Sequence, residues 1–146
     1  MNEVRYKNLA FRLMQSYRNN PYHSQVHAAD VTQNLAQMIE VQGVKETCDL
    51  TSFDIFITLI SGAAHDMDHP GTNNVFETKN ISKLAILYND QAVLENHHAA
   101  SFFFMLDNIK LDCNIMSDFT PEQRLAARKM ILENILCTDM TKHQGI

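Results

Sequence analysis

The stretch "LTSFDIFITLISGAAHD", Leu50 to Asp66, decides the fold class of this chain. Its β-branched and aromatic residues would also suit a buried strand. Its length and its smooth passage into the small residues 62–64 favour a helix instead, and a helix that is apolar almost all round belongs inside a core. Thr51 precedes Asp54 with the spacing of a capping box. We therefore expect a buried central helix here.

Helical patterns also occupy the segments on both sides of this stretch. Residues 27–41, "HAADVTQNLAQMIEV", place apolar side chains at helical spacing, and Gly43 is expected to end that helix. Further helices are expected in residues 81–89 and 90–108. Because the sequence contains no pair of alternating apolar and polar segments, the predicted fold is all-α, a multi-helix bundle.

The remaining segments carry boundary signals. Residues 69–80, "HPGTNNVFETKN", form a turn-rich loop in which Thr72 is able to cap a short helix. Residues 120–143 have the pattern of a last helix, with Thr120 as its N-cap and Gln123 closing a capping box. Both signals agree with the all-α prediction.

Composition and charge limit the function classes. The 146 residues, 45% of them hydrophobic, suffice for one domain with a modest core. The formal net charge of -5, with acids and bases interspersed, provides no basic surface for nucleic acid or an anionic membrane. No apolar run approaches the roughly 20 residues that cross a bilayer, and the polar start is unlike a secretory signal. The cysteines, 3 in number, indicate neither a disulfide framework nor a cysteine-built zinc site. We expect a cytoplasmic domain without nucleic-acid or membrane partners.

Histidines gather in three short clusters. His23 and His27, in "NPYHSQVHAAD", are spaced to share one side of a helix. His65 and Asp66 follow the central helix at the mouth of the core, where charge is costly unless it is paired or bound to metal. The third cluster is "LENHH", residues 94–98, inside an apolar helix. Alone, the first pair would be interpreted as surface histidines and the second as a polar loop. Together the clusters indicate a site.

Four motifs now follow one another in register: "NPYHSQVHAADV", "AAHDMDHPGTNN", "LYNDQAVLENHH" and "LCTDMTKH". Their order and spacing resemble the class I cyclic-nucleotide phosphodiesterases, and the resemblance extends from Tyr17 to His143. An isolated HD dipeptide would suggest only the broader HD-type metallohydrolases. The resemblance implies hydrolysis of cAMP, cGMP or both to the 5′-nucleotide by a two-metal mechanism, in cyclic-nucleotide signal transduction.

The resemblance also implies a role for each matched residue. His23 corresponds to the general acid that protonates the departing ribose oxygen. His27, His65 and Asp66 correspond to ligands of the tighter metal ion, usually zinc, and Asp66 also bridges to a second ion, usually magnesium or manganese. The positions that orient the waters of the second ion are matched by His69, Glu95 and Thr138. The positions that line the substrate pocket are matched by Tyr22, Asn74 and Met140.

The chain also departs from the family. Ser24 stands where asparagine is usual, and His97 and His98 lie in the signature without an assigned role. In the family a later aspartate completes the ligands of the first metal and a later glutamine grips the purine, and the chain stops before both. Residues 1–146 are therefore expected to be a partial, truncated catalytic domain with weak activity alone. The alternative is a catalytically dead metal-binding or interaction module that pairs with a full-length phosphodiesterase. Apolar faces left uncovered would favour self-association.

Overall fold

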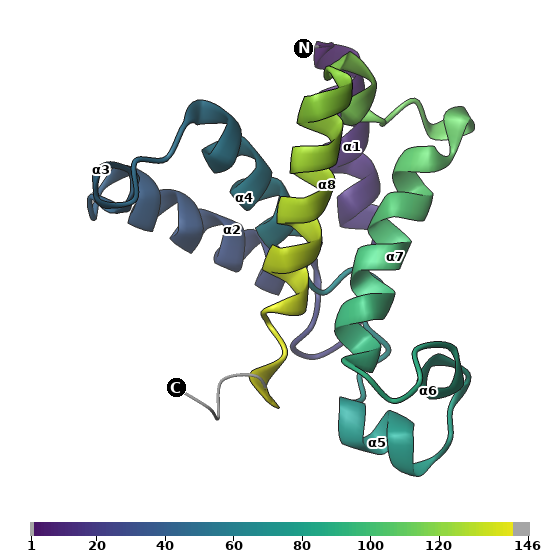
Figure 1. Ribbon diagram of the computed structural model, residues 1–146. Helices are drawn as coiled ribbons and strands as arrows, with labels where there is room; N and C mark the ends of the chain where they lie inside the picture. The colour runs from purple at the N-terminus through teal and green to yellow at the C-terminus, as the bar shows by residue number, and fades with distance from the viewer. Residues whose placement is uncertain (1, 142–146) are drawn as a thin grey trace.

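The computed structural model describes residues 2–141, and these residues form helices joined by short loops (Figure 1). No strand occurs within this part of the chain, so the all-α prediction is confirmed. The α-helices and two short 3-10 helices follow in the order α1 Glu3–Ser16, α2 Gln25–Glu40, α3 Val44–Thr47, α4 Ser52–Ala64, α5 Asn74–Lys79, α6 Lys83–Leu87, α7 Val93–Asp107, η1 Ile109–Leu111, η2 Ile115–Asp118 and α8 Pro121–Leu136.

The predicted central helix is confirmed as α4, which packs between α2 and α8. Its capping box forms as expected, because the Thr51 hydroxyl accepts from the Asp54 N–H at 3.2 Å and the Asp54 carboxylate accepts from the Thr51 N–H at 2.9 Å. Satisfying these end groups fixes where the helix begins. The apolar length of α4 is then free to be buried.

The core lies where α4, α7 and α8 meet. Ile57, Phe102 and Ile131, one from each helix, are all 0% exposed. Figure 1 shows α8 lying between α4 and α7, with α1 behind it. The predicted cap of α8 is confirmed, since the Thr120 hydroxyl accepts from the Gln123 N–H at 3.2 Å.

Three sequence expectations about helix ends are wrong in detail. The helix that Gly43 was expected to end stops at Glu40, and Gly43, with a φ of +76°, begins α3 instead. Asn73, not Thr72, caps α5, because the Asn73 side chain accepts from the backbone within the first turn. The last helix ends at Leu136, and residues 142–143 of its predicted span lie outside the described residues.

The helix ends, rather than the helix faces, position the polar clusters. The first turns of α2 and α7 and the last turns of α4 and α8 converge on one region of the molecule, while α5 and α6 project to one side and pack chiefly against each other and α7 (Figure 1). Within residues 2–141, no helix combines the length and the apolar character that a membrane crossing requires.

Candidate active site

A cavity of about 420 Å³ opens where these helix ends converge. It contains every residue that the sequence predicted for the site except Tyr22. The lining comes from the segment before α2 and the first turn of α2, the end of α4 and the loop after it, the start of α5, the start of α7 and the segment after α8. The predicted site residues within this lining are His23, His27, His65, Asp66, His69, Asn74, Glu95, Thr138 and Met140. Residues separated by more than a hundred positions in the chain therefore share one space.

Three histidine side chains of this cavity converge on the carboxylate of Asp66. The Nδ1 atom of His23 lies 2.7 Å from its Oδ2 oxygen. The Nε2 atoms of His27 and His65 lie 3.3 Å and 3.2 Å from the same oxygen. Asp66 itself is buried. Three imidazole rings thus surround one carboxylate oxygen.

Asp66 and His65 each stabilise the charged form of the other. Burial alone would raise the pKa of the Asp66 carboxyl, but hydrogen bonding and attraction from His65, with a further hydrogen bond from His23, hold that pKa well below its usual range. Burial alone would lower the pKa of His65, but its interactions with Asp66 outweigh this and raise it. Asp66 is therefore ionised at neutral pH, and His23 must donate its Nδ1 proton to it.

His65 has the orientation of a metal ligand. Its Nδ1 donates to the carbonyl oxygen of Gly62 at 2.8 Å, which leaves Nε2 facing Asp66. Such a bond to the far ring nitrogen fixes the orientation of a ligating imidazole. Its raised pKa favours a proton between Nε2 and the carboxylate, the position that a divalent cation would take with release of that proton.

His27 completes a candidate cation site with His65 and Asp66. One ligand atom from each of the three lies within 4.8 Å of the others. Burial lowers the pKa of His27, so its ring is neutral at physiological pH and can offer a nitrogen lone pair. Two imidazole nitrogens and an anionic oxygen form a suitable donor set for zinc with an open fourth position.

A second group of the same kind contains His23, Asp66 and His69. The Nδ1 of His69 accepts the N–H of Gly71 at 3.0 Å, and burial together with repulsion from His23 lowers the pKa of His69 to about 4. Neutral His69 therefore carries its proton on Nε2. A donor at this nitrogen suits the orientation of water or carboxylate better than the ligation of a metal.

His23 does not share a helical face with His27, contrary to the sequence expectation. Helix α2 begins at Gln25, so His23 lies before it and Ser24 is the N-cap. The two rings are nevertheless neighbours, with centroids 5.8 Å apart. His23 also stacks on His69, with centroids 3.8 Å apart and planes 5° from parallel. This stacking fixes the plane of the His23 ring.

The outer residues of the site are held by hydrogen bonds or lie at its rim. The side-chain amide of Asn74 donates to the Glu95 carboxylate at 2.9 Å, which orders both side chains. Met140 is 73% exposed at the cavity edge. Tyr22 does not line the cavity, because its exposed ring packs against His27 from outside, at 4.5 Å between centroids.

Sequence reasoning left out two buried polar residues of this cavity. His98 is 2% exposed and donates from Nδ1 to the carbonyl oxygen of Met67 at 2.8 Å. Burial lowers the pKa of His98 to about 4, so it is neutral here. Asp139 is also buried and accepts from the hydroxyl of Thr141 at 2.7 Å. The adjacent histidines of "LENHH" were a signal for the first. An acid just after the last helix, where the helix dipole disfavours negative charge, was a weak signal for Asp139.

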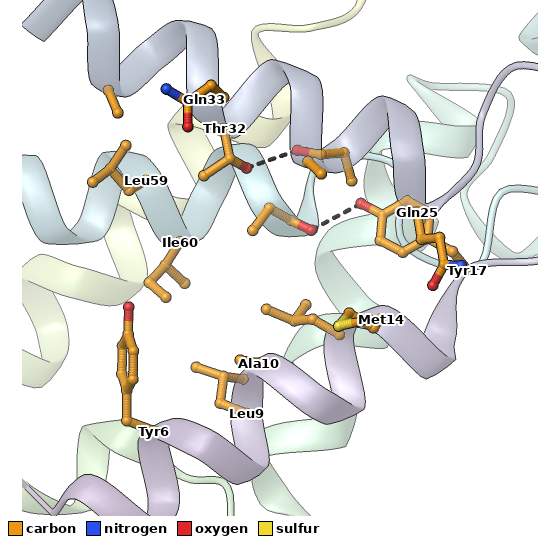
Figure 2. A pocket seen from close by; sticks show the side chains of 15 residues that line it. Tyr6, Leu9, Ala10, Met14, Tyr17, Gln25, Thr32, Gln33, Leu59 and Ile60 are labelled. Atoms are coloured by element: carbon orange, nitrogen blue, oxygen red, sulfur yellow. Dashed lines mark hydrogen bonds between the residues drawn. The ribbon is translucent and has the colours of Figure 1, made fainter.

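A separate apolar groove of about 420 Å³ lies between α1 and the α2–α4 pair (Figure 2). None of the described residues that line it is a histidine, a cysteine or a charged residue. The Tyr17 hydroxyl donates to the carbonyl oxygen of Ala63 at 2.9 Å, and burial, with the nearby Asp66 charge, raises the pKa of Tyr17. The described lining of the groove thus offers no carboxylate, imidazole or thiol, and the candidate cation ligands lie in the histidine cavity.

The fold and the cavity together define an all-helical protein with a candidate histidine–aspartate cation site. The sequence model of the 3′5′-cyclic nucleotide phosphodiesterase family matches residues 22–146, and the chain belongs to this family. The structure is similar to the phosphodiesterase domain of the RhoPDE fusion protein from the choanoflagellate Salpingoeca rosetta, with a TM-score of 0.87 and 30% identity. That similarity covers 98% of this chain and 44% of the other.

Curated relatives agree with this assignment. The chain is 38% identical over 130 residues to a probable 3′,5′-cyclic-AMP phosphodiesterase of Caenorhabditis elegans, covering 89% of this chain and 19% of that protein. It is 38% identical over 129 residues to a 3′,5′-cyclic-AMP phosphodiesterase of Drosophila melanogaster, covering 88% and 12%. It is 35% identical over 130 residues to 3′,5′-cyclic-AMP phosphodiesterase 4C of Rattus norvegicus, covering 89% and 24%. The chain thus spans less than a quarter of the length of these relatives.

Proposed function

We propose that this chain carries the histidine–aspartate part of a catalytic site that hydrolyses a 3′,5′-cyclic nucleotide to the 5′-nucleotide. The observation that carries the proposal is the convergence of His23, His27 and His65 on one oxygen of Asp66, inside a cavity. The names of the relatives, all cyclic-AMP phosphodiesterases, favour cAMP as the substrate over cGMP.

The reaction requires a cation that activates water and an acid that protonates the leaving oxygen. Water adds to phosphorus and releases a proton to solvent, the bond from phosphorus to the ribose 3′-oxygen breaks, and that oxygen takes up a proton from an acid. His27, His65 and Asp66 would hold the first cation, zinc, and Asp66 would also hold a second, magnesium or manganese, with waters oriented by His69, Glu95 and Thr138. Divalent cations at such a site lower the pKa of bound water and offset phosphoryl charge.

His23 supplies the proton in this proposal. Its Nδ1 proton is committed to Asp66, so His23 acts as the imidazolium: Nε2 carries the proton that passes to the ribose 3′-oxygen, and the ring is left neutral. Stacking on His69 and hydrogen bonding to Asp66 hold the ring from two directions. Because the ring is held in this way, little side-chain conformational entropy has to be lost when it donates to the leaving oxygen.

The remaining predicted residues form the walls. Asn74, fixed by Glu95, offers an amide to the nucleotide, while Met140 provides an apolar edge. Tyr22 braces His27 from outside the cavity and is assigned to the entrance.

The test is conversion of cAMP to 5′-AMP in the presence of zinc and of magnesium or manganese. Because the relatives are several times longer, we use the purified chain and also a chimera, the rat 4C phosphodiesterase with its matched segment replaced by this chain. We expect little turnover from the chain alone and clear turnover from the chimera. Assays with cGMP define selectivity, and 2′,3′-cyclic AMP controls for cleavage of the correct bond.

One outcome would overturn the proposal. If the chimera folds and takes up zinc but converts no cyclic nucleotide, while the unaltered rat enzyme does, the chain lacks the catalytic groups assigned to it. Zinc uptake without turnover would then support the alternative of a catalytically dead metal-binding module.

A further inference from the structure

Asp68 occupies an unfavourable backbone conformation in the loop between the cation site and α5. Its φ is +57°, in the left-handed region that most L-residues avoid and that aspartate enters more readily than most. It lies two positions after Asp66 and directly before His69. A residue in this conformation persists only when its surroundings hold it.

Two separate parts of the chain hold Asp68. Arg18, in the segment after α1, donates from two guanidinium nitrogens to the two carboxylate oxygens, at 2.7 Å and 3.1 Å. His97 in α7 donates from Nε2 to Oδ2 at 2.9 Å. The Asp68 N–H also donates to the carbonyl oxygen of Ser16 at 3.2 Å. Arg18 is half exposed, so its main contribution is the fixed geometry of a bidentate pair rather than binding energy.

Met67, the residue before Asp68, is also held by α7. His98 donates to the carbonyl oxygen of Met67 at 2.8 Å, so the adjacent histidines of α7 grip two adjacent residues of the loop. The His69 N–H in turn donates to the carbonyl oxygen of Asp66 at 3.1 Å. The direction of the Asp66 and His69 side chains therefore depends on where residues 67–68 are fixed.

We infer that Asp68, held between Arg18 and His97, is a positioning group that fixes the turn from His65 to His69 and thereby the geometry of the cation site. This inference rests on the cation site of the proposed function. It also gives His97 a role, because this side chain touches neither the substrate nor the cation and acts through Asp68.

The test is zinc affinity of the purified chain, measured by competition with a chromophoric chelator, together with the visible spectrum of the Co²⁺ form. Asp68→Asn keeps the size and the tolerance of a left-handed backbone but loses the carboxylate. Asp68→Gly keeps only the backbone. We expect both to weaken zinc binding by about 10–100-fold and to alter the Co²⁺ bands. His97→Leu should do the same, whereas His97→Gln, which retains a donor, should restore most of the affinity.

Asp112 provides a matched control. It too has a positive φ, of 40°, and its carboxylate binds an arginine of α1, Arg5, at 3.2 Å. It follows η1 at the opposite end of α7 from His97. Asp112→Asn should leave zinc affinity and the Co²⁺ spectrum unchanged, and thermal unfolding of each variant without metal reports any loss of fold.

Three outcomes are decisive against the inference. If the wild-type chain binds no zinc, both the cation site and this inference fail. If the wild type binds zinc and both Asp68 variants bind it within twofold, only the inference fails. If Asp112→Asn or His97→Gln weakens zinc as much as Asp68→Asn, the effect belongs to general stability rather than to positioning, and the inference again fails.

Discussion

The Nδ1 atom of His23 and the Oδ2 atom of Asp66 are 2.7 Å apart. The side chain assigned to proton delivery and the side chain assigned to the cation are therefore directly hydrogen-bonded. A change at Asp66 should disturb both proton delivery and cation binding, whereas a change at His23 should disturb proton delivery alone.

Removal of the His23 imidazole should reduce turnover and spare metal binding. In the chimera, His23→Ala is expected to lower kcat for cAMP by about 10²–10⁴-fold, because the ribose oxygen must then leave without a positioned acid. Zinc content, measured on the same samples, should stay at the wild-type level. Asn19→Ala, an exposed residue of the same segment, is the control. Equal activity of the wild type and His23→Ala would remove His23 from the mechanism.

Removal of a proposed ligand should abolish tight zinc uptake. His27→Ala and Asp66→Asn each leave two protein ligands, fewer than the three that open zinc sites normally keep. Titration with zinc against a chelator should show no tight binding for either variant. Glu40→Gln, at the far end of the helix that carries His27, should bind as the wild type does. Unchanged uptake in His27→Ala would refute the ligand assignment.

The stability of the chain should fall in acid partly through Glu77. Hydrogen bonds from Ser82 and Thr72 lower the pKa of this buried carboxyl in the folded state. The unfolded state then binds more protons in the acid range, so the stabilisation is complete above an ordinary carboxyl pKa of about 4.3 and is lost as pH falls through the lower, folded value.

Glu77→Gln tests this linkage. Urea unfolding should show a deficit for the variant near neutral pH that closes as the pH drops below about 4. Thr72→Val, which removes one of the two hydroxyl donors, should reduce the same pH dependence partway. A deficit that stays constant from neutral pH into the acid range would contradict the explanation.

The two faces of α8 should differ sharply in their contribution to stability. Ile131→Ala removes a side chain that is 0% exposed at the centre of the core, and its cost should be about 2–5 kcal/mol in the free energy of unfolding. Leu125→Ala, on the same helix but 73% exposed, should cost no more than about 0.5 kcal/mol. Denaturant unfolding monitored by circular dichroism provides both values, and similar losses would contradict the packing of α8 against α4 and α7.

The fold was predictable from local signals, because apolar periodicity and capping residues act within one or two helical turns. Thr51 and Thr120 therefore marked helix starts correctly. Gly43 misled because a left-handed glycine can end one helix or begin the next, and only the path of the chain decides which.

The sequence indicated most of the residues that share the histidine cavity, but it could not indicate how they are arranged. His23 belongs beside His27, yet the sequence could not tell that it lies before the helix and is held by Asp66 and His69. Asp68 belongs to the polar group that follows the central helix, but its role could not be predicted, since its backbone conformation and its two partners depend on contacts with segments about 30 to 50 residues away along the chain. Contacts between distant segments produce no periodic pattern in the sequence.

The side projection formed by α5 and α6 gives the cavity a wall that is separable from the core. Within residues 74–87, only Glu77 and Ala85 are buried, and Asn74 ties the projection to α7 by its bonds to Glu95 and to the Leu94 N–H, each at 2.9 Å. Segments with so little apolar burial open at a fraction of the free energy of global unfolding, and their amide hydrogens exchange early. The α5–α6 wall of the cavity can thus open locally while Ile57, Phe102 and Ile131 stay packed.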